Sequence, residues 1–307
     1  MSVHAIRYLK RSVLDTVRWD ECIDRSPNGL VYGYSFYLDA VAKHWDALVM
    51  GDYEAVMPLT WNKKWGFRYL YQPPFTQQLG IFSPKEISSS LITNFLEKLT
   101  LRFRFGEIFL NHGNGHPAFT RHSNFIISLD TPYSSLCLNY KGDAVRNLGR
   151  SRRFGLSYTT QTDLLTALNA YRCEYGERIP HLKNSDYRRF ERLCGIAQQN
   201  KELIVRTVLN SDSNILAVSV LLQKNKRLYL IQSTTFAAGR KVEANYYLID
   251  QIIEEFAGKG FLLDFEGSDI PGIAHFYSNF GSVDQPYFFY RFNHLPSVVR
   301  WLKNRRS

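Results

Sequence analysis

The sequence predicts a mixed α/β fold (α+β) made of two similar domains, each with a twisted mixed sheet flanked by helices. Its 307 residues are enough for about two domains of ordinary size. Hydrophobic residues form 45% of the chain, which is enough for two cores and argues against disorder. The order of predicted strands and helices in the first half nearly recurs in the second half, which indicates an internal repeat.

The first half of the chain alternates between strand and helix patterns. Short apolar runs predict strands, and apolar residues at helical spacing predict helices. Gly51 and Asp52 separate two such runs, which is a strong β-hairpin signal. The predicted strands cover residues 3–8, 47–50, 53–61, 67–71, 107–110 and 124–129, and the predicted helices cover residues 14–23, 35–45 and 88–103.

The second half begins with a basic, helical segment, residues 140–155. It then reads as strand, two helices, three strands, helix, strand, helix and strand. The predicted strands cover residues 156–159, 203–209, 215–222, 227–232, 261–263 and 287–292, and the predicted helices cover residues 163–178, 185–199, 243–257, 271–280 and 296–303. Residues 233–241 are expected to form a loop between a strand and a helix.

Residues 261–281 form the stretch around which the rest of the chain is organised. A short apolar strand leads to Asp264 and Glu266, and carboxylates on alternate residues at a strand end point the same way. Gly267 allows the backbone to turn or to approach a ligand closely. A helix follows and ends at Gly281, so the stretch reads as strand, polar corner, helix and stop.

The polar corner DFEGS and the following IPGIAHFYSNFG resemble the C-terminal signature of the Fem-type (FemAB-like) proteins, the tandem members of the GNAT acyltransferase superfamily. The basic segment is similar to the helix that opens the second domain of that family. The resemblance implies two GNAT-like domains, residues 1–140 and 141–292, with residues 293–307 packing back on the first domain as a helix.

The resemblance also implies an enzyme that transfers an acyl group from an acyl-CoA cosubstrate to an amine. One group must take a proton from the amine, and another must protonate the leaving group. Asp264 and Glu266 are the candidate bases, although Asp264 also suits a capping or packing role. Tyr277 matches the tyrosine that protonates the leaving thiolate in many GNAT enzymes, and its alternative role is that of a core aromatic residue. Fem-type proteins often carry Lys at this position, so Tyr277 favours acyl-CoA over aminoacyl-tRNA.

Two segments are candidates for binding the phosphates of the donor. GNAT enzymes hold the cofactor pyrophosphate with a Gly-rich loop before a helix N-terminus, which offers free N–H groups. The corresponding loop here has one glycine, and an ordinary surface loop is the alternative. The residues assigned to this donor site are Gln232, Ser233, Gly239, Arg240, Lys241 and Asn245. One helical face of the basic segment carries Arg146, Arg150 and Arg153. These arginines are expected either to contact the phosphates of a nucleotide or RNA or to form a solvated face.

Charge and cysteine content narrow the class of protein. The net charge is +10, which favours an acidic partner such as a nucleotide, RNA or an anionic membrane. The four cysteines form no CxxC pair, and no metal-binding, Walker-type or GxSxG pattern is present. The N-terminal residues have no apolar signal-peptide core and no apolar run is long enough to span a bilayer, so a soluble, cytoplasmic protein is expected.

Three functions are compatible with these patterns. The first is an N-acyltransferase that uses acyl-CoA and a small-molecule or peptide amine, without a metal. The second is a Fem-type aminoacyl transferase that uses aminoacyl-tRNA and a peptidoglycan precursor. The third is a non-catalytic binding protein with the same fold, which the single glycine of the 238–241 loop favours. Fold resemblance alone does not name the substrate.

Overall fold

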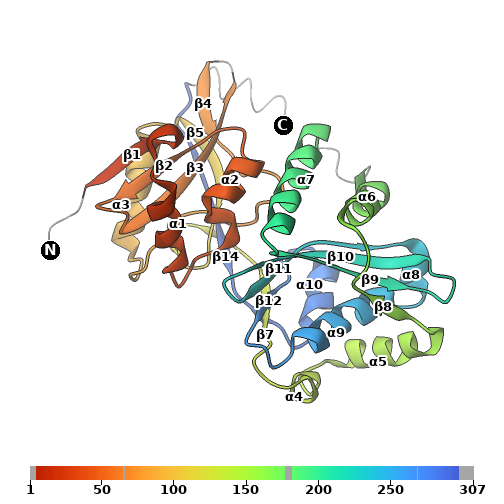
Figure 1. Ribbon diagram of the computed structural model, residues 1–307. Coiled ribbons are helices and arrows are strands. Elements are labelled where there is room, and N and C mark those ends of the chain that lie inside the picture. Colours follow the sequence, from red (N-terminus) through yellow and green to blue (C-terminus); the bar gives the residue numbers. More distant parts are fainter. Residues whose placement is uncertain (1–4, 65, 177–181, 268, 297–307) are drawn as a thin grey trace. The chain divides into compact units, whose positions relative to one another are not determined.

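The computed structural model describes most of the chain, namely residues 5–64, 66–176, 182–267 and 269–296. The chain forms two compact units (Figure 1). Unit 1 comprises Met1–His122 and Pro286–Ser307, and unit 2 comprises Ser123–Gln285. Within the described residues each unit contains one seven-stranded mixed sheet flanked by helices, which confirms the predicted fold class.

The sheet of unit 1 has the strand order β1-β2-β3-β4-β5-β14-β6. Neighbouring strands are antiparallel except for β4 and β5, which are parallel. The strands are β1 (Ile6–Lys10), β2 (Trp45–Met50), β3 (Ala55–Lys64), β4 (Phe67–Leu70), β5 (Phe105–Leu110), β6 (Thr120–His122) and β14 (Tyr287–Asn293). The helices are α1 (Thr16–Asp24), α2 (Ser35–Val41) and α3 (Ser89–Thr100), with 3₁₀ turns at Arg11–Val13 and Val31–Gly33.

Local sequence signals account for much of unit 1. Gly51 has a φ of 54° in the turn between β2 and β3, and Met50 pairs with Ala55, so the predicted hairpin is confirmed. The apolar residues of α3 recur at helical spacing and form the stripe that packs on the sheet. The buried residues of that stripe are Ile92, Phe95 and Leu99.

The sheet of unit 2 has the strand order β13-β7-β12-β11-β10-β9-β8, and only β11 and β12 are parallel neighbours. The strands are β7 (Phe125–Ser128), β8 (Ser157–Thr159), β9 (Leu203–Leu209), β10 (Ile215–Lys224), β11 (Arg227–Thr235), β12 (Leu262–Asp264) and β13 (Val283–Asp284). The helices are α4 (Tyr133–Cys137), α5 (Gly142–Ser151), α6 (Leu164–Tyr175), α7 (Asn184–Gln199), α8 (Ala237–Lys241), α9 (Ala244–Phe256) and α10 (Pro271–Ser278), with a 3₁₀ turn at Arg152–Phe154.

The two sheets match strand by strand. Counted from β1 in unit 1 and from β8 in unit 2, the first three strand pairs are antiparallel. The fourth pair is parallel, and it is β4–β5 in unit 1 and β11–β12 in unit 2. The next position is filled in each sheet by a strand that is distant in sequence from its parallel-paired neighbour, β5 or β12. This strand is β14 in unit 1 and β7 in unit 2. The repeat predicted from element order is therefore a repeat of sheet topology.

Two predicted strands belong to a different sheet than expected. The strand predicted at 124–129 is β7, which pairs with β12 and β13 in unit 2, although the boundary at residue 140 places it in the first domain. The strand predicted at 287–292 is β14, which pairs with β5 and β6 in unit 1 rather than in the second domain. Strand propensity is local, whereas the choice of partner depends on packing between distant segments. The units accordingly divide after His122 and after Gln285.

Short elements also differ from the predictions. The loop expected at 233–241 contains the helical turn α8, and α4, β6 and β13 have no counterpart among the predicted elements. The helix expected at 296–303 lies outside the described residues except for Pro296. Among the helices that the structure describes, none is both long enough and apolar enough to cross a bilayer.

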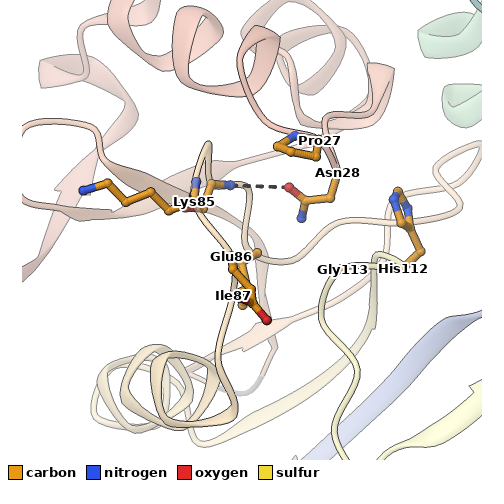
Figure 2. Close-up of a pocket in the computed structure, with 8 residues that line it drawn as sticks. Pro27, Asn28, Lys85, Glu86, Ile87, His112 and Gly113 are labelled. Carbon is orange, nitrogen blue, oxygen red and sulfur yellow. Dashed lines mark hydrogen bonds between the residues drawn. The ribbon is translucent and has the colours of Figure 1, made fainter.

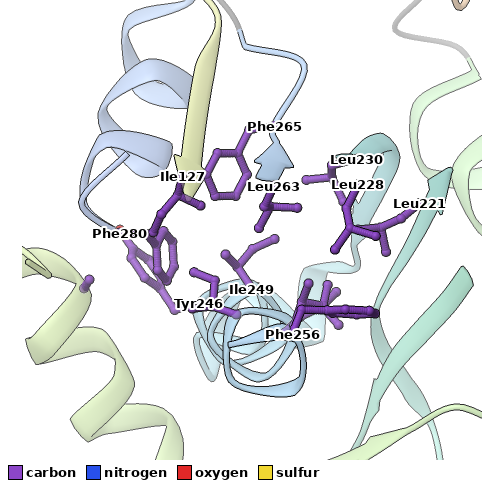
Figure 3. Packing of buried hydrophobic residues seen from close by; sticks show 14 of the residues in the cluster. Ile127, Leu221, Leu228, Leu230, Tyr246, Ile249, Phe256, Leu263, Phe265 and Phe280 are labelled. Carbon is purple, nitrogen blue, oxygen red and sulfur yellow. The ribbon is translucent and has the colours of Figure 1, made fainter. Parts of the chain in front are cut away.

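The core of unit 2 forms between α9 and the sheet. Figure 3 shows Ile249 and Phe256 of α9 among strand residues such as Leu228 and Leu263. Each such side chain stabilises the fold by about 1.5–3 kcal/mol when it is fully buried. Phe280, which follows α10, belongs to the same cluster and attaches the end of that helix to the core. The helix that carries Tyr277 is thus anchored to the core near its C-terminal end, whereas Ile273 in its first half is exposed.

The ladder between β11 and β12 is short. It runs from the pair Arg227–Leu262 to the pair Tyr229–Asp264, where β12 ends. The strand β11 continues to Thr235 and pairs there only with β10 among the described residues. The ladder between the two parallel strands therefore opens beyond Asp264, and the residues that follow β12 stay beside β7, where the N–H of Phe265 donates to the carbonyl oxygen of Phe125 at 2.9 Å.

A buried carboxylate links α9 to the segment that begins unit 2. Asp250 is 3% exposed, and its Oδ1 accepts hydrogen bonds from the hydroxyls of Tyr133 (2.7 Å) and Tyr140 (3.0 Å). Burial raises the pKa of Asp250, and the two tyrosine hydrogen bonds oppose this shift only in part. The folded state therefore binds the Asp250 proton more tightly than the unfolded chain does.

We expect Asp250→Asn to change how stability depends on pH. The contribution of Asp250 is fully present below the unfolded pKa of about 4 and declines as pH rises through the higher folded pKa. The difference in unfolding free energy between wild type and Asp250→Asn should therefore fall from pH 4 upward, as measured by urea unfolding at several pH values. Asp143→Asn is the matched control, because the pKa of Asp143 is lowered by its hydrogen bond with His275 and its difference should change in the opposite direction. A difference for Asp250→Asn that is constant with pH would contradict this assignment.

Candidate active site

Asp264 is held inside a hydrogen-bonded network at the end of β12. It is fully buried, and its Oδ2 accepts hydrogen bonds from Nε (2.9 Å) and Nη2 (2.7 Å) of Arg227. Its Oδ1 accepts the backbone N–H of Glu266 at 2.9 Å. Arg227 also donates to Oε1 of Gln285 at 2.7 Å. These contacts favour the packing role of Asp264 over the role of catalytic base.

Glu266, two residues beyond the end of β12, has an unusual backbone conformation. Its φ is 50°, in the left-handed region that costs a non-glycine residue about 1–3 kcal/mol. The hydrogen bond from its N–H to Asp264 holds this conformation. Gly267 follows, and a Cβ there would lie 2.4 Å from Cα of Asn124, so glycine is required by close packing on the segment before β7. The glycine thus serves backbone packing rather than ligand approach.

Tyr277 of α10 lies beside this corner. Its ring stacks on Phe265 with centroids 4.6 Å apart and an interplanar angle of 17°. Burial raises the pKa of Tyr277, and the negative charge of Glu266 raises it further. Among the described residues its hydroxyl makes no hydrogen bond. Tyr277 is therefore a neutral phenol at ordinary pH, able to donate a proton, and at the same time a packed aromatic residue.

Two further tyrosines come from α6. The rings of Tyr171 and Tyr175 are 5.4 Å apart, and the hydroxyl of Tyr175 accepts the backbone N–H of Thr235, the last residue of β11, at 3.5 Å. Burial raises the pKa of Tyr171 to about 12, with contributions from nearby tyrosines and from Glu266. We call the set Phe265, Glu266, Tyr277, Tyr171 and Tyr175 the tyrosine–glutamate cluster. Sequence analysis missed the two α6 tyrosines, because their i, i+4 spacing indicates only a shared helix face.

The predicted phosphate loop is used for internal contacts. Gly239 is buried in α8, and a Cβ there would lie 2.2 Å from the carbonyl oxygen of Leu216, so this glycine allows α8 to pack on β10. Nη1 of Arg240 donates to the carbonyl oxygen of Thr235, and Nη2 pairs with Glu174 at 2.9 Å. Lys241 is exposed.

The other residues predicted to bind the donor also make hydrogen bonds within the protein or are buried. Gln232 is 4% exposed, and its Nε2 donates to the carbonyl oxygen of Ala167 at 2.9 Å. Ser233 accepts a hydrogen bond from Ser219 at 3.1 Å. Oδ1 of Asn245 is buried without a partner among the described residues.

The N-terminus of α9 carries an acidic residue where a phosphate would be expected. Glu243 precedes the helix with a φ of 57°, and its carboxylate pairs with Nη1 of Arg150 at 2.9 Å. The Glu243 side chain makes no capping hydrogen bond, but it places a negative charge near the helix N-terminus, where a phosphate would otherwise be attracted. Together with the internal contacts of Arg240, this arrangement does not fit the Gly-rich pyrophosphate cradle that an acyl-CoA donor would use.

The basic helix α5 is partly neutralised by carboxylates. It buries Ala144, Leu148 and Ser151 and exposes its arginines. Arg146 pairs with Asp143 at 2.5 Å, and Arg150 pairs with Glu243. Arg153, in the 3₁₀ turn that follows, is exposed and has no carboxylate partner among the described residues. His275 of α10 contacts Asp143 at 2.7 Å, so it also belongs to this surface group.

Unit 1 contains a separate pocket of about 350 Å³ (Figure 2). Asn28 lines it and is 5% exposed, and its Nδ2 donates to Oδ1 of Asn111 at 2.8 Å. A Cβ at Gly113 would lie 2.8 Å from Nδ2 of Asn28, so these two lining residues are closely packed against each other. Lys85 and Glu86, which have opposite charges, also line the pocket, so its charge selects neither anions nor cations. Among the described residues no group of His, Cys, Asp or Glu could hold a metal ion.

Comparison with known proteins identifies the fold of both units. A family model described as "Acetyltransferase (GNAT) domain" matches residues 140–272. This match covers most of unit 2. The whole chain is similar to the crystal structure of FemX, with a TM-score of 0.64, 11% identity, and coverage of 94% of this chain and 98% of that chain. The search of curated proteins found no match.

Two other solved structures extend this result. A tandem GNAT protein from the clavulanic acid biosynthesis pathway has a TM-score of 0.53 and 10% identity, with coverage of 95% of this chain and 100% of that chain. L-PGS from Bacillus licheniformis has a TM-score of 0.52 and 10% identity, with coverage of 93% of each chain. At these identities the likeness concerns the fold. The chain thus has the tandem, Fem-like GNAT fold, as the resemblance in residues 261–281 implied.

Proposed function

We propose that the protein is an N-acyltransferase whose chemistry takes place at the tyrosine–glutamate cluster of unit 2. The observation that supports this proposal is that the ring of Tyr277 stacks on Phe265, the residue before Glu266, just beyond the end of the ladder between β11 and β12. Glu266 is a carboxylate that can accept a proton, and Tyr277 is a phenol held neutral by burial and by that carboxylate. The GNAT match of unit 2 supports acyl transfer as the reaction class.

The proposed steps require only groups of this chain and the two substrates. The amine nitrogen attacks the acyl carbonyl carbon, a C–N bond forms, and the bond from that carbon to the leaving group breaks. Glu266 takes the proton that the amine loses, and Tyr277 gives a proton to the leaving sulfur or oxygen. The rate of amide formation from an acyl donor and a primary amine, compared between wild type and Tyr277→Phe, tests this proposal.

Two acyl donors are compatible with the proposed reaction. The GNAT match and Tyr277 support acyl-CoA, whereas the carboxylate of Glu243 at the start of α9 disfavours a pyrophosphate there. Aminoacyl-tRNA, with a peptidoglycan precursor as acceptor, is the alternative that the Fem-like fold supports. A non-catalytic binding role would remain if neither donor yields product.

A basic surface of unit 1 specifically favours an RNA donor. Cζ of Arg68 lies 4.5 Å from the ring centroid of Trp61, and Cζ of Arg102 lies 4.9 Å from that of Tyr8. Lys63 pairs with Arg68 across β3 and β4 and therefore points to the same face. We call Tyr8, Trp61, Lys63, Arg68 and Arg102 the basic–aromatic face. Among the described residues its three cations have no carboxylate partner, so they can contact phosphates.

The acidic residue closest to this face is already bound. Asp46 is 6% exposed and accepts hydrogen bonds from the hydroxyl of Tyr8, from the backbone N–H of Arg11 (3.0 Å) and from Nε1 of Trp61 (2.8 Å). Among the described residues, β1 to β4 expose no large hydrophobic side chain that could insert into a membrane. The face therefore suits a hydrated polyanion such as RNA better than a lipid surface.

Salt-dependent RNA binding distinguishes the two donors. Replacing Lys63, Arg68 and Arg102 with Gln should weaken binding of a tRNA-length RNA. It should also make the slope of log K against log salt shallower by about 2, because three phosphate contacts are lost. Replacing Arg146, Arg150 and Arg153 with Gln should have a smaller effect, since two of these arginines already pair with carboxylates. Fluorescence anisotropy at several salt concentrations measures both variants. Unchanged binding by both variants at low salt would reject RNA as the donor and return the choice to acyl-CoA.

A further inference from the structure

We propose that α5 and the residues that flank it bind an anionic lipid bilayer and hold unit 2 reversibly at a membrane surface. We call the exposed cationic and large apolar side chains of residues 138–154 the α5 surface. The inference goes beyond the proposed function, because lipid binding needs neither the tyrosine–glutamate cluster nor an acyl donor. The partner is a bilayer whose head groups carry negative charge.

One face of α5 packs on the protein, and the opposite face is open. The buried residues Ala144, Leu148 and Ser151 recur at i, i+4 and i+7 and so lie on one side of the helix. Ala144 and Leu148 belong to the core cluster of α9, and Figure 1 shows α5 alongside α9. A Cβ at Gly142 or Gly149 would meet no atom of a neighbouring element within 4 Å. No other described part of the chain therefore covers the outward side of α5 at these positions.

Three large apolar side chains of the α5 surface are in contact with solvent. Leu138, at the C-cap of α4, is 85% exposed, and Val145 of α5 and Phe154 of the following 3₁₀ turn are also exposed. Single exposed apolar side chains are normal on a protein surface, whereas several in one short stretch indicate an interaction site. Each of the three would gain free energy by entering the interfacial region of a bilayer.

The same stretch is strongly basic. Its five exposed cations are Lys141, Arg146, Arg150, Arg152 and Arg153. Within the described part of the chain, Lys141, Arg152 and Arg153 have no carboxylate partner. The other two arginines pair with Asp143 and Glu243, which are partly buried. Five cations and two carboxylates leave the α5 surface with a net positive charge, which complements anionic head groups.

The combination of cations with apolar side chains favours a bilayer over RNA. Anionic head groups attract lysine and arginine, and the adjacent acyl chains accept apolar side chains. RNA offers phosphates but no apolar region for Leu138 or Val145. The basic–aromatic face of unit 1 differs in this respect, because the described residues of β1 to β4 expose no large apolar side chain. Since α5 has 10 residues, it can lie in the head-group region but cannot cross the bilayer.

Vesicle sedimentation tests this inference without any substrate. The probes are vesicles of phosphatidylcholine alone and vesicles of phosphatidylcholine mixed equally with phosphatidylglycerol. Wild type should sediment with the mixed vesicles and stay in solution with the neutral ones. Added salt should weaken binding to the mixed vesicles, because exposed charges are screened. Equal binding to both kinds of vesicle, or binding to neither, would overturn the inference.

Replacing Leu138, Val145 and Phe154 with Ser should weaken binding to the mixed vesicles by at least about 10-fold. Each methylene group that no longer enters the bilayer lowers the binding constant by about fourfold. All three side chains are exposed, so the melting temperature should change little. The matched control replaces with Ser three exposed apolar side chains of unit 1, namely Val13, Val17 and Leu101. This control should bind like wild type, and equal losses in the two triple variants would contradict a specific role of the α5 surface.

Replacing Lys141, Arg152 and Arg153 with Gln should weaken binding to the mixed vesicles by about fivefold for each lost cation. The same variant should bind a tRNA-length RNA like wild type. If it instead loses RNA binding while its vesicle binding is unchanged, the α5 surface contacts RNA and the inference is wrong.

Amide hydrogen exchange of wild type locates the contact without any substitution. The amides of residues 138–154 should exchange more slowly when mixed vesicles are present, and neutral vesicles should have no effect. Slower exchange in another part of the chain, with residues 138–154 unchanged, would overturn the inference even if the protein sediments with mixed vesicles.

Discussion

Tyr277→Phe is expected to lower the rate of acyl transfer by about 10²–10⁴-fold, the usual worth of general-acid catalysis. The substitution removes only the hydroxyl, which makes no hydrogen bond to another described residue. The ring can still stack on Phe265, whose centroid lies 4.6 Å away. The melting temperature should therefore change little. Steady-state rates with the donor that supports transfer, together with thermal unfolding, measure both effects.

Tyr158→Phe is the matched control for this variant. The Tyr158 hydroxyl donates to Oε2 of Glu255 at 2.6 Å, in a structural cluster with Arg206 outside the opening between β11 and β12. Removing it should cost stability of about 0.5–1.5 kcal/mol, the net worth of one hydrogen bond, and leave turnover unchanged. If Tyr277→Phe instead destabilises the protein and folded molecules turn over normally, Tyr277 is a core residue. That result would also remove the main support for an acyl-CoA donor.

Asp264→Ala is expected to destabilise unit 2 strongly. The side chains of Asp264 and Arg227 are 0% and 10% exposed, so the variant leaves a buried guanidinium without its carboxylate. Breaking a buried pair in this way costs about 3–5 kcal/mol, which corresponds to about 6–20 °C in melting temperature for a unit of this size. The variant also frees the Glu266 N–H that holds the left-handed conformation of that residue. Thermal and urea unfolding measure the loss.

An exposed ion pair supplies the comparison for Asp264→Ala. The side chains of Arg18 and Asp52 are 42% and 72% exposed, so Asp52→Ala should change stability little. The catalytic alternative for Asp264 makes a different prediction. If Asp264→Ala keeps the wild-type melting temperature and loses transfer activity, then Asp264 is the base and Glu266 is not.

The sequence by itself determined the class of fold and most of its elements. Apolar residues at helical spacing predicted α3 and α9, and the Gly51-Asp52 pair predicted the hairpin of β2 and β3. These signals depend on neighbours within a few residues, so the local sequence contains them completely. The stretch 261–281 likewise carried its strand, corner and helix, and with them the resemblance that predicted the fold. Glu266 and Tyr277 could be identified for the same reason.

Tertiary structure alone decided which strands pair and which side chains contact each other. Residues 287–292 form a strand in any case, but only pairing with β5 and β6 assigns it to unit 1. Asp264 finds its partner Arg227 on another strand, and Tyr175 of α6 accepts a hydrogen bond from Thr235 of β11. Arg240 looks like part of a phosphate loop in sequence, yet pairing with Glu174 gives it an internal contact, and Glu243 at the start of α9 pairs with Arg150. Strand pairing and ion pairing join residues far apart in the chain, so their outcome depends on which surfaces pack together, and no short pattern records that choice.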